Sequence, residues 1–213
     1  MRYYVGLSLA SGSSMDSGLA ILDEDNTLIM VDKLYKVNDI MHFFDNFPST
    51  ANSDICVSLA WDKTMLNGKW RILSKPYQMV STNPLFPNQD NWTQRYTTRA
   101  SDYLKSLIEK GAVVNRFELF LTRQNMHLNS CFKERSPADC KFLQQALTNE
   151  WGMDLPVNMM PMSQLEAIVG AILAKENAKN PSNVHTIGEF RTLPVIDVIK
   201  NPNESFCDTA VFS

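Results

Sequence analysis

One stretch of the chain, residues 60–99, combines side chains that could bind a single-stranded nucleic acid. It contains six basic residues against two acidic ones, with six aromatic residues between them. Rings stack on bases while cations contact phosphates, so this interleaving is typical of single-strand sites. The alternative is structural: the aromatic side chains form a small core beneath a long lid, because an ordered segment of this length must bury apolar surface. The binding candidates in the stretch are Trp70, Arg71, Lys75, Trp92 and Arg99.

The four cysteines and three histidines lack the spacing of a metal site. No two cysteines are separated by two residues, and the histidines are scattered, so we do not expect zinc. Buried, unreactive thiols are the expectation instead. The formal net charge is −3. This charge predicts no global attraction to nucleic acid but allows a local basic patch.

The first sixty residues predict three antiparallel strands, a helix and a fourth strand. Short turns between the first three strands favour an antiparallel meander. The fourth strand is apolar without alternation, as expected of a strand covered on both faces. The expected strands are residues 3–9, 17–22, 27–35 and 55–60, and apolar spacing predicts a helix at 37–47.

The rest of the chain predicts helices that alternate with strands, after a segment at 60–98 without clear periodicity. We expect one domain, residues 1–213, in which 60–98 is a long lid or insertion. No apolar stretch has the length of a membrane helix, so a membrane partner is not expected and the cytoplasm is the expected compartment. Helices are expected at 99–110, from Ser136 to about 151 and from Ser163 onward. Residues 117–121 are expected to form a strand or to extend a helix, residues 157–160 to form a short strand, and residues 184–199 to hold a last strand or a hairpin.

Five stretches follow one another in an order and spacing that span most of the chain. They are residues 5–10, 17–22, 55–60, 99–104 with Gly111 following, and 161–174. Together they resemble a bacterial family of predicted nucleases related to Holliday-junction resolvases of the RuvC type. The resemblance implies the ribonuclease H-like fold, which is α/β with a mixed central sheet: three antiparallel strands, then parallel strands, with helices on both faces.

The resemblance also implies a crevice at the carboxyl ends of the first and fourth strands, where active members carry acidic side chains. Two metal ions need several carboxylates to balance their charge and to hold a phosphate for in-line attack. The family usually has aspartate at the positions of Ser8 and Ser58, and a serine hydroxyl is a neutral, weak ligand for Mg²⁺. The catalytic and metal-ligating candidates that remain are Asp62, Asp102 and Glu166.

Each of these acids also has a local structural explanation. Glu166 follows Ser163 by three residues and could close a capping box. Asp102 lies in the first turn of a predicted helix, where an acid favours the helix dipole. Asp62 could be a solvated loop residue, and Asp16, before the second strand, is a further candidate.

The sequence therefore predicts a divergent ribonuclease H-like protein with impaired two-metal catalysis and a retained binding crevice. The alternative is an active Mg²⁺- or Mn²⁺-dependent nuclease that acts on DNA or RNA phosphodiesters. A nucleic acid, single-stranded or structured, is the candidate partner, and Ser8, Ser58 and Arg99 are expected to face it. A third class, phosphotransferases of the actin-like superfamily, shares the core topology. It needs a Gly-rich phosphate loop, for which residues 11–14 offer only a short Gly/Ser turn.

Overall fold

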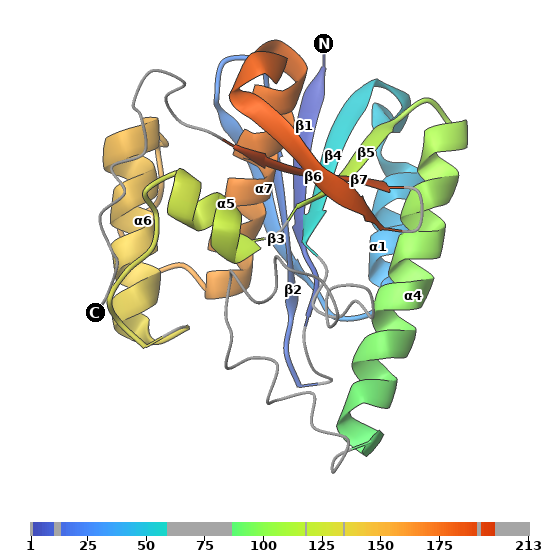
Figure 1. Cartoon of the computed structure of the whole chain (residues 1–213), viewed down its shortest axis with the longest axis horizontal. Coiled ribbons are helices and arrows are strands. Elements are labelled where there is room, and N and C mark those ends of the chain that lie inside the picture. Colours follow the sequence, from blue (N-terminus) through green and yellow to red (C-terminus); the bar gives the residue numbers. More distant parts are fainter. Residues whose placement is uncertain are drawn as a thin grey trace.

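The computed structural model describes residues 2–10, 14–58, 87–117, 119–133, 135–190 and 193–198. In this part of the chain, a mixed sheet of seven strands is accompanied by helices (Figure 1). The strands are β1 (Tyr3–Ser8), β2 (Ser17–Leu22), β3 (Leu28–Leu34), β4 (Ser53–Ser58), β5 (Val113–Phe117), β6 (Val184–Phe190) and β7 (Leu193–Val198). The helices are α1 (Val37–Asn46), α4 (Pro87–Glu109), α5 (Leu119–Asn125), α6 (Pro137–Trp151) and α7 (Met162–Lys179), with short 3₁₀ turns at Thr50–Asn52 and Pro181–Asn183.

The sheet has the strand order β3-β2-β1-β4-β5-β7-β6. The first three strands are antiparallel, β1, β4, β5 and β7 are parallel, and β6 pairs antiparallel with β7. The predicted α/β class, the mixed sheet and the initial β-β-β-α-β order are confirmed. Of the strand or hairpin expected within residues 184–199, the hairpin is present as β6 and β7.

Helices cover both faces of the sheet, because its central strands are apolar on both sides. In β1, Tyr4 packs with the apolar side chains of α7, whereas Val5 and Leu7 pack with those of α1 and α4. Figure 1 shows α7 on one side of β1 and β4, and α1 with α4 on the other. Packing of α7 on one face and of α1 and α4 on the other holds the carboxyl ends of β1 and β4 in place.

Helix α4 begins earlier than the sequence predicts. The expectation of a helix at 99–110 is wrong in its start, because residues 87–98 also belong to α4. Pro87 opens the helix, where the missing N–H of proline costs nothing. Tyr96, Ala100 and Leu104 repeat at helical spacing and are all buried against the sheet. The remainder of the predicted lid, residues 60–86, lies outside the described residues.

Two predicted strands are also wrong. Residues 157–160 form no strand; instead the Gln144 side chain donates to the carbonyl oxygens of Pro156 and Asn158 and accepts from the Met160 N–H. These side-chain bonds replace a strand ladder. At 117–121 the strand interpretation is wrong, because β5 ends at Phe117, whereas α5 begins at Leu119, in agreement with the helical alternative. Buried polar residues within β5 interrupt the apolar run that would have marked it.

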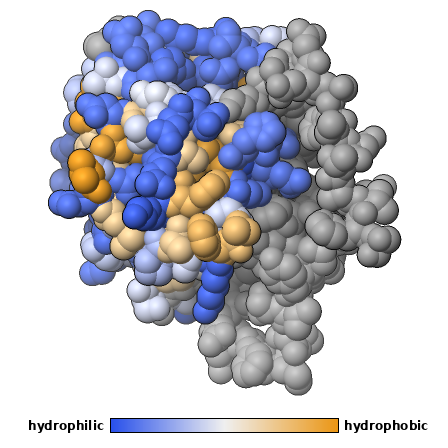
Figure 2. Space-filling view, turned by 90° about the vertical axis from the view of Figure 1, so that its left-hand side faces the viewer, coloured by the Kyte–Doolittle hydropathy of each residue, from blue (hydrophilic) through white to orange (hydrophobic). Residues whose placement is uncertain are grey.

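The face that carries α6 presents apolar side chains among polar ones (Figure 2). Phe132 is 50% exposed and Met159 57% exposed. Among the described helices, none has both the length and the apolar character needed to cross a membrane. Of the cysteines, Cys56 and Cys140 are buried as expected, but Cys131 is exposed.

Candidate functional site

The carboxyl ends of β1 and β4 form the centre of the candidate site. The two strands are parallel neighbours, and Ser8 lies opposite Ser58 in their register. The predicted proximity of these two serines is therefore confirmed. Ser8 is buried and Ser58 is half-buried. Ligands of open α/β sheets bind outside the carboxyl ends of such strands.

Glycines on β1 and β2 allow α7 to pack directly against these strands. A Cβ atom on Gly6 would lie 1.8 Å from the carbonyl oxygen of Ala167, and one on Gly18 would lie 1.8 Å from the carbonyl oxygen of Ser163. Any side chain would therefore push the helix backbone away. Glu166 lies between these two contacts along α7, so the close packing brings it to the end of β1.

Glu166 is buried, and its carboxylate accepts hydrogen bonds from Ser8 and Arg135. Its Oε2 atom accepts a hydrogen bond of 2.7 Å from Ser8 Oγ. The same oxygen lies 3.2 Å from Arg135 Nη2. The hydroxyl thus donates to this carboxylate, and the guanidinium offsets its charge. The capping box suggested for Glu166 is wrong, because α7 begins at Met162 with Pro161 at the N-cap.

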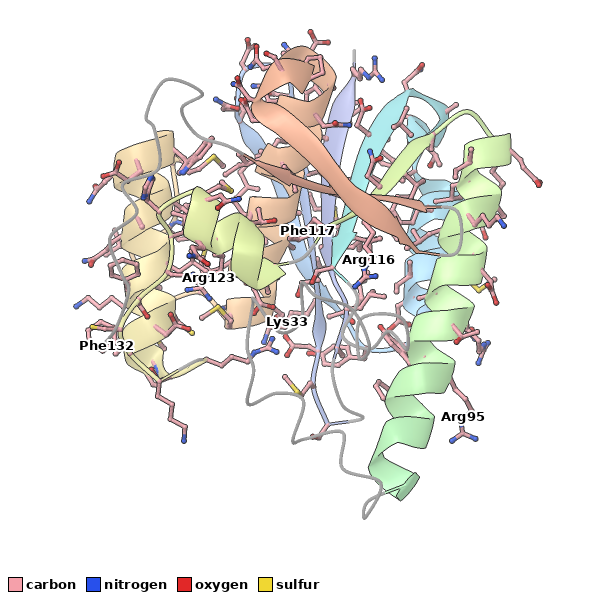
Figure 3. All side chains as sticks on the ribbon, in the orientation of Figure 1. Lys33, Arg95, Arg116, Phe117, Arg123 and Phe132 are labelled. Carbon is pink, nitrogen blue, oxygen red and sulfur yellow. The ribbon has the colours of Figure 1, made fainter. Side chains whose placement is uncertain are left out.

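A buried aspartate holds the loop that presents Arg135. The Oδ1 atom of Asp139 accepts from Arg123 Nη2 at 2.9 Å and from Ser130 Oγ at 2.7 Å, and its Oδ2 atom accepts from the backbone N–H of Arg135 at 3.0 Å. Arg123 projects from α5 toward α6 (Figure 3). Burial alone would raise the pKa of Asp139, but these donors outweigh it and hold the pKa below its ordinary value. Arg135 has a left-handed backbone, with φ of 59°. That conformation is costly for a residue with a side chain, so the surrounding contacts impose it.

A second carboxylate lies at the beginning of α7. Asp16 Oδ2 accepts from Ser163 Oγ at 2.8 Å and lies 3.4 Å from Lys33 Nζ. Burial alone would raise the pKa of Asp16, but its hydrogen bonds and the Lys33 ammonium lower it below its ordinary value. Figure 3 shows Lys33 near the end of the sheet where β1 and β4 end. Asp16, like Glu166, therefore has a cation of the protein beside it.

The structure brings together only some of the residues singled out from the sequence. Ser8 and Glu166 are in contact, whereas Asp102 is exposed on α4, in the layer on the other face of the sheet. In the part of the chain that the structure describes, no group of three or more His, Cys, Asp or Glu side chains is placed to hold a metal ion. Trp92 and Arg99 line a separate pocket beside α1. Asp62, Trp70, Arg71 and Lys75 lie outside the described residues.

Sequence reasoning missed Arg135, the residue that distinguishes this site. Arg135 is 31 residues from Glu166, and no local pattern links the two. The only signal was indirect: the helix start Ser136-Pro137-Ala138-Asp139, whose N-cap bond from Asp139 N–H to Ser136 Oγ is present. That cap places Asp139, and Asp139 in turn orients the Arg135 backbone.

The carboxyl edge thus combines a serine pair, a buried carboxylate and a guanidinium. Each carboxylate at this edge lies beside a cation of the protein: Glu166 beside Arg135, and Asp16 beside Lys33. No family model matches the chain, and no curated protein matches it either.

Proposed function

We propose that this chain is a divergent ribonuclease H-like protein of the RuvC-type kind that lacks two-metal catalysis and uses its carboxyl-edge crevice for binding. The strand order β3-β2-β1-β4-β5, with β1 and β4 parallel at its centre, agrees with that fold. So does the position of α7, whose acidic residue reaches the end of β1. The β6–β7 hairpin extends the sheet beyond β5.

The single observation that carries the proposal is the environment of Glu166. Two-metal catalysis requires several carboxylates around the ions, since each ion brings two positive charges. Here the neighbour on β1 is the neutral Ser8, and the neighbour from the α5–α6 loop is the cation Arg135. A divalent ion at Glu166 would have to displace or repel the guanidinium, with no second carboxylate from β1 to compensate.

The partner proposed for the crevice is a nucleic acid, which the protein would contact through its phosphates. A guanidinium at a strand-end crevice is suited to an anionic oxygen, which it can contact with two parallel N–H groups. Arg135 is 31% exposed, so part of it remains accessible to a ligand. The same residue that opposes a metal ion therefore favours a phosphate.

Calorimetric titration with Mn²⁺ tests the proposal. The wild-type protein should show no binding in the low millimolar range. Arg135→Gln alone should remain a poor binder, because it frees Glu166 without supplying another carboxylate. The double variant Ser8→Asp with Arg135→Gln should gain measurable Mn²⁺ affinity, because it restores two adjacent acids. Tight Mn²⁺ binding by the wild-type protein that is lost in Glu166→Gln would contradict the proposal.

A further inference from the structure

Strand β3 forms one edge of the sheet and carries exposed apolar side chains. In the part of the chain that the structure describes, β3 pairs with β2 on one side and is the outermost strand. It begins with the apolar run Leu28–Val31, in which Ile29 is 51% and Met30 36% exposed. The N–H and C=O groups of an outermost strand can pair with another chain. An apolar run of this kind at an edge favours association between sheets.

Carboxylates bind two backbone N–H groups at the end of this edge. Asp32 Oδ1 accepts from the Lys33 N–H at 2.7 Å, and Asp39 Oδ2, from the first turn of α1, accepts from the Tyr35 N–H at 2.9 Å. The N–H groups of alternate residues point to the same side of a strand. The donors of Lys33 and Tyr35 therefore lie on one side, and side chains of the chain itself already bind them. A further strand could pair there only by displacing these carboxylates.

The apolar run also contains an irregularity of the ladder. The register between β2 and β3 shifts where Ile21 pairs with Met30 and Leu22 with Leu28, so Ile29 has no counterpart in β2. An extra residue of this kind bends the strand and increases its twist. Bulges and charged side chains are the features by which natural proteins keep edge strands from pairing. Both are present in β3.

A second copy of this chain is the partner that such an edge would meet, because each copy presents the same apolar run. In an antiparallel pairing of two β3 strands about Val31, Asp32 of each copy would lie opposite Met30 of the other. Its exposed carboxylate would be placed against an apolar side chain, and its hydrogen bond to the Lys33 N–H would be lost. We infer that Asp32 closes β3 and prevents two copies from joining their sheets edge to edge. This role of Asp32 is independent of any ligand at the carboxyl edge.

Sedimentation velocity over a concentration series tests this role of Asp32. Asp32→Val should associate at concentrations about tenfold or more below any at which the wild type does, because the change acts twice in a symmetric pair. Valine favours strands, so the variant should fold, and melting curves check this. Asp25→Val is the matched control: it makes the same substitution at an exposed residue of the β2–β3 turn and should behave like the wild type. Asp32→Asn keeps an oxygen acceptor for the Lys33 N–H and should associate less than Asp32→Val.

Hydrogen exchange of the β3 amides identifies the surface that associates. Amides of residues 28–34 should exchange more slowly in associated Asp32→Val than in the wild type. Equal association of Asp32→Val and Asp25→Val would overturn the inference, because loss of charge anywhere would then suffice. Asp32→Val that sediments like the wild type, or that associates without protecting β3, would also overturn it. So would a wild-type protein that already associates with β3 protected. Equal association of Asp32→Asn and Asp32→Val would show that the hydrogen bond to Lys33 does not close the edge.

Discussion

Replacing Arg135 with glutamine removes the cation that faces the buried carboxylate of Glu166. The two side chains are 31% and 4% exposed, and Nη2 lies 3.2 Å from Oε2. Losing a charge-assisted hydrogen bond costs about 1.5–3 kcal/mol, and the partial exposure of Arg135 lowers this by screening. We therefore expect the free energy of unfolding to fall by about 1–2 kcal/mol. For a chain of this length, the melting temperature should decrease by about 2–8 °C.

Urea unfolding followed by circular dichroism measures this effect. Glu166→Gln and the double variant complete a thermodynamic cycle, in which the coupling between the two residues should be about 1 kcal/mol. Lys141→Gln, which removes an exposed charge from α6, is the control and should leave the midpoint nearly unchanged. If Arg135→Gln unfolds like this control and the coupling is zero within error, the guanidinium does not balance the buried carboxylate.

Three further variants test the fold that positions the site. Gly6→Ala should destabilise the protein by about 3 kcal/mol or more in urea unfolding, because its Cβ would lie 1.8 Å from the backbone oxygen of Ala167. Gly152→Ala is the matched control: it meets nothing within 4 Å but has φ of 64°, so about 1 kcal/mol is expected. Because the folded pKa of Asp139 is lowered, its stabilisation is present above the unfolded value of about 3.9 and is lost as pH falls below it. A melting series from neutral to acidic pH should therefore fall less steeply in Asp139→Asn. Gln144→Ala should cost about 2 kcal/mol, because it leaves loop carbonyl groups without their donor; an unchanged melting temperature would show that water replaces the amide.

The strand pairing at the centre of the sheet could be predicted because it follows from local patterns. The apolar runs around Val5 and Ile55, separated by an antiparallel meander and one amphipathic helix, leave few topologies that avoid crossings. The β-β-β-α-β order, together with the fold that the resemblance implies, placed Ser8 beside Ser58. Local patterns failed for β5, where Asn115 and Arg116 are buried polar residues in a strand of five residues. Periodicity cannot identify a strand whose polar residues face inward.

The interactions of the candidate site could be predicted only in part. Glu166 was identified because it follows a helix start within residues 161–174, one of the stretches that resemble the RuvC-related family. It does contact Ser8. Arg135 could not be found in this way, because its position depends on how α6 and the preceding loop pack against α7. The start of α4 was missed because residues 87–91 are polar except for Pro87, so no apolar repeat marks the first turn.

Cleavage assays on labelled single-stranded, double-stranded and junction DNA and on RNA, with and without EDTA, test the loss of two-metal catalysis most directly. With Mg²⁺ or Mn²⁺ present, the wild-type protein should give no more product than Glu166→Gln, because Glu166 belongs to no metal-binding cluster of side chains within the residues that the structure describes and lies beside Ser8 and Arg135. EDTA-sensitive cleavage by the wild type that disappears in Glu166→Gln would contradict the proposed function.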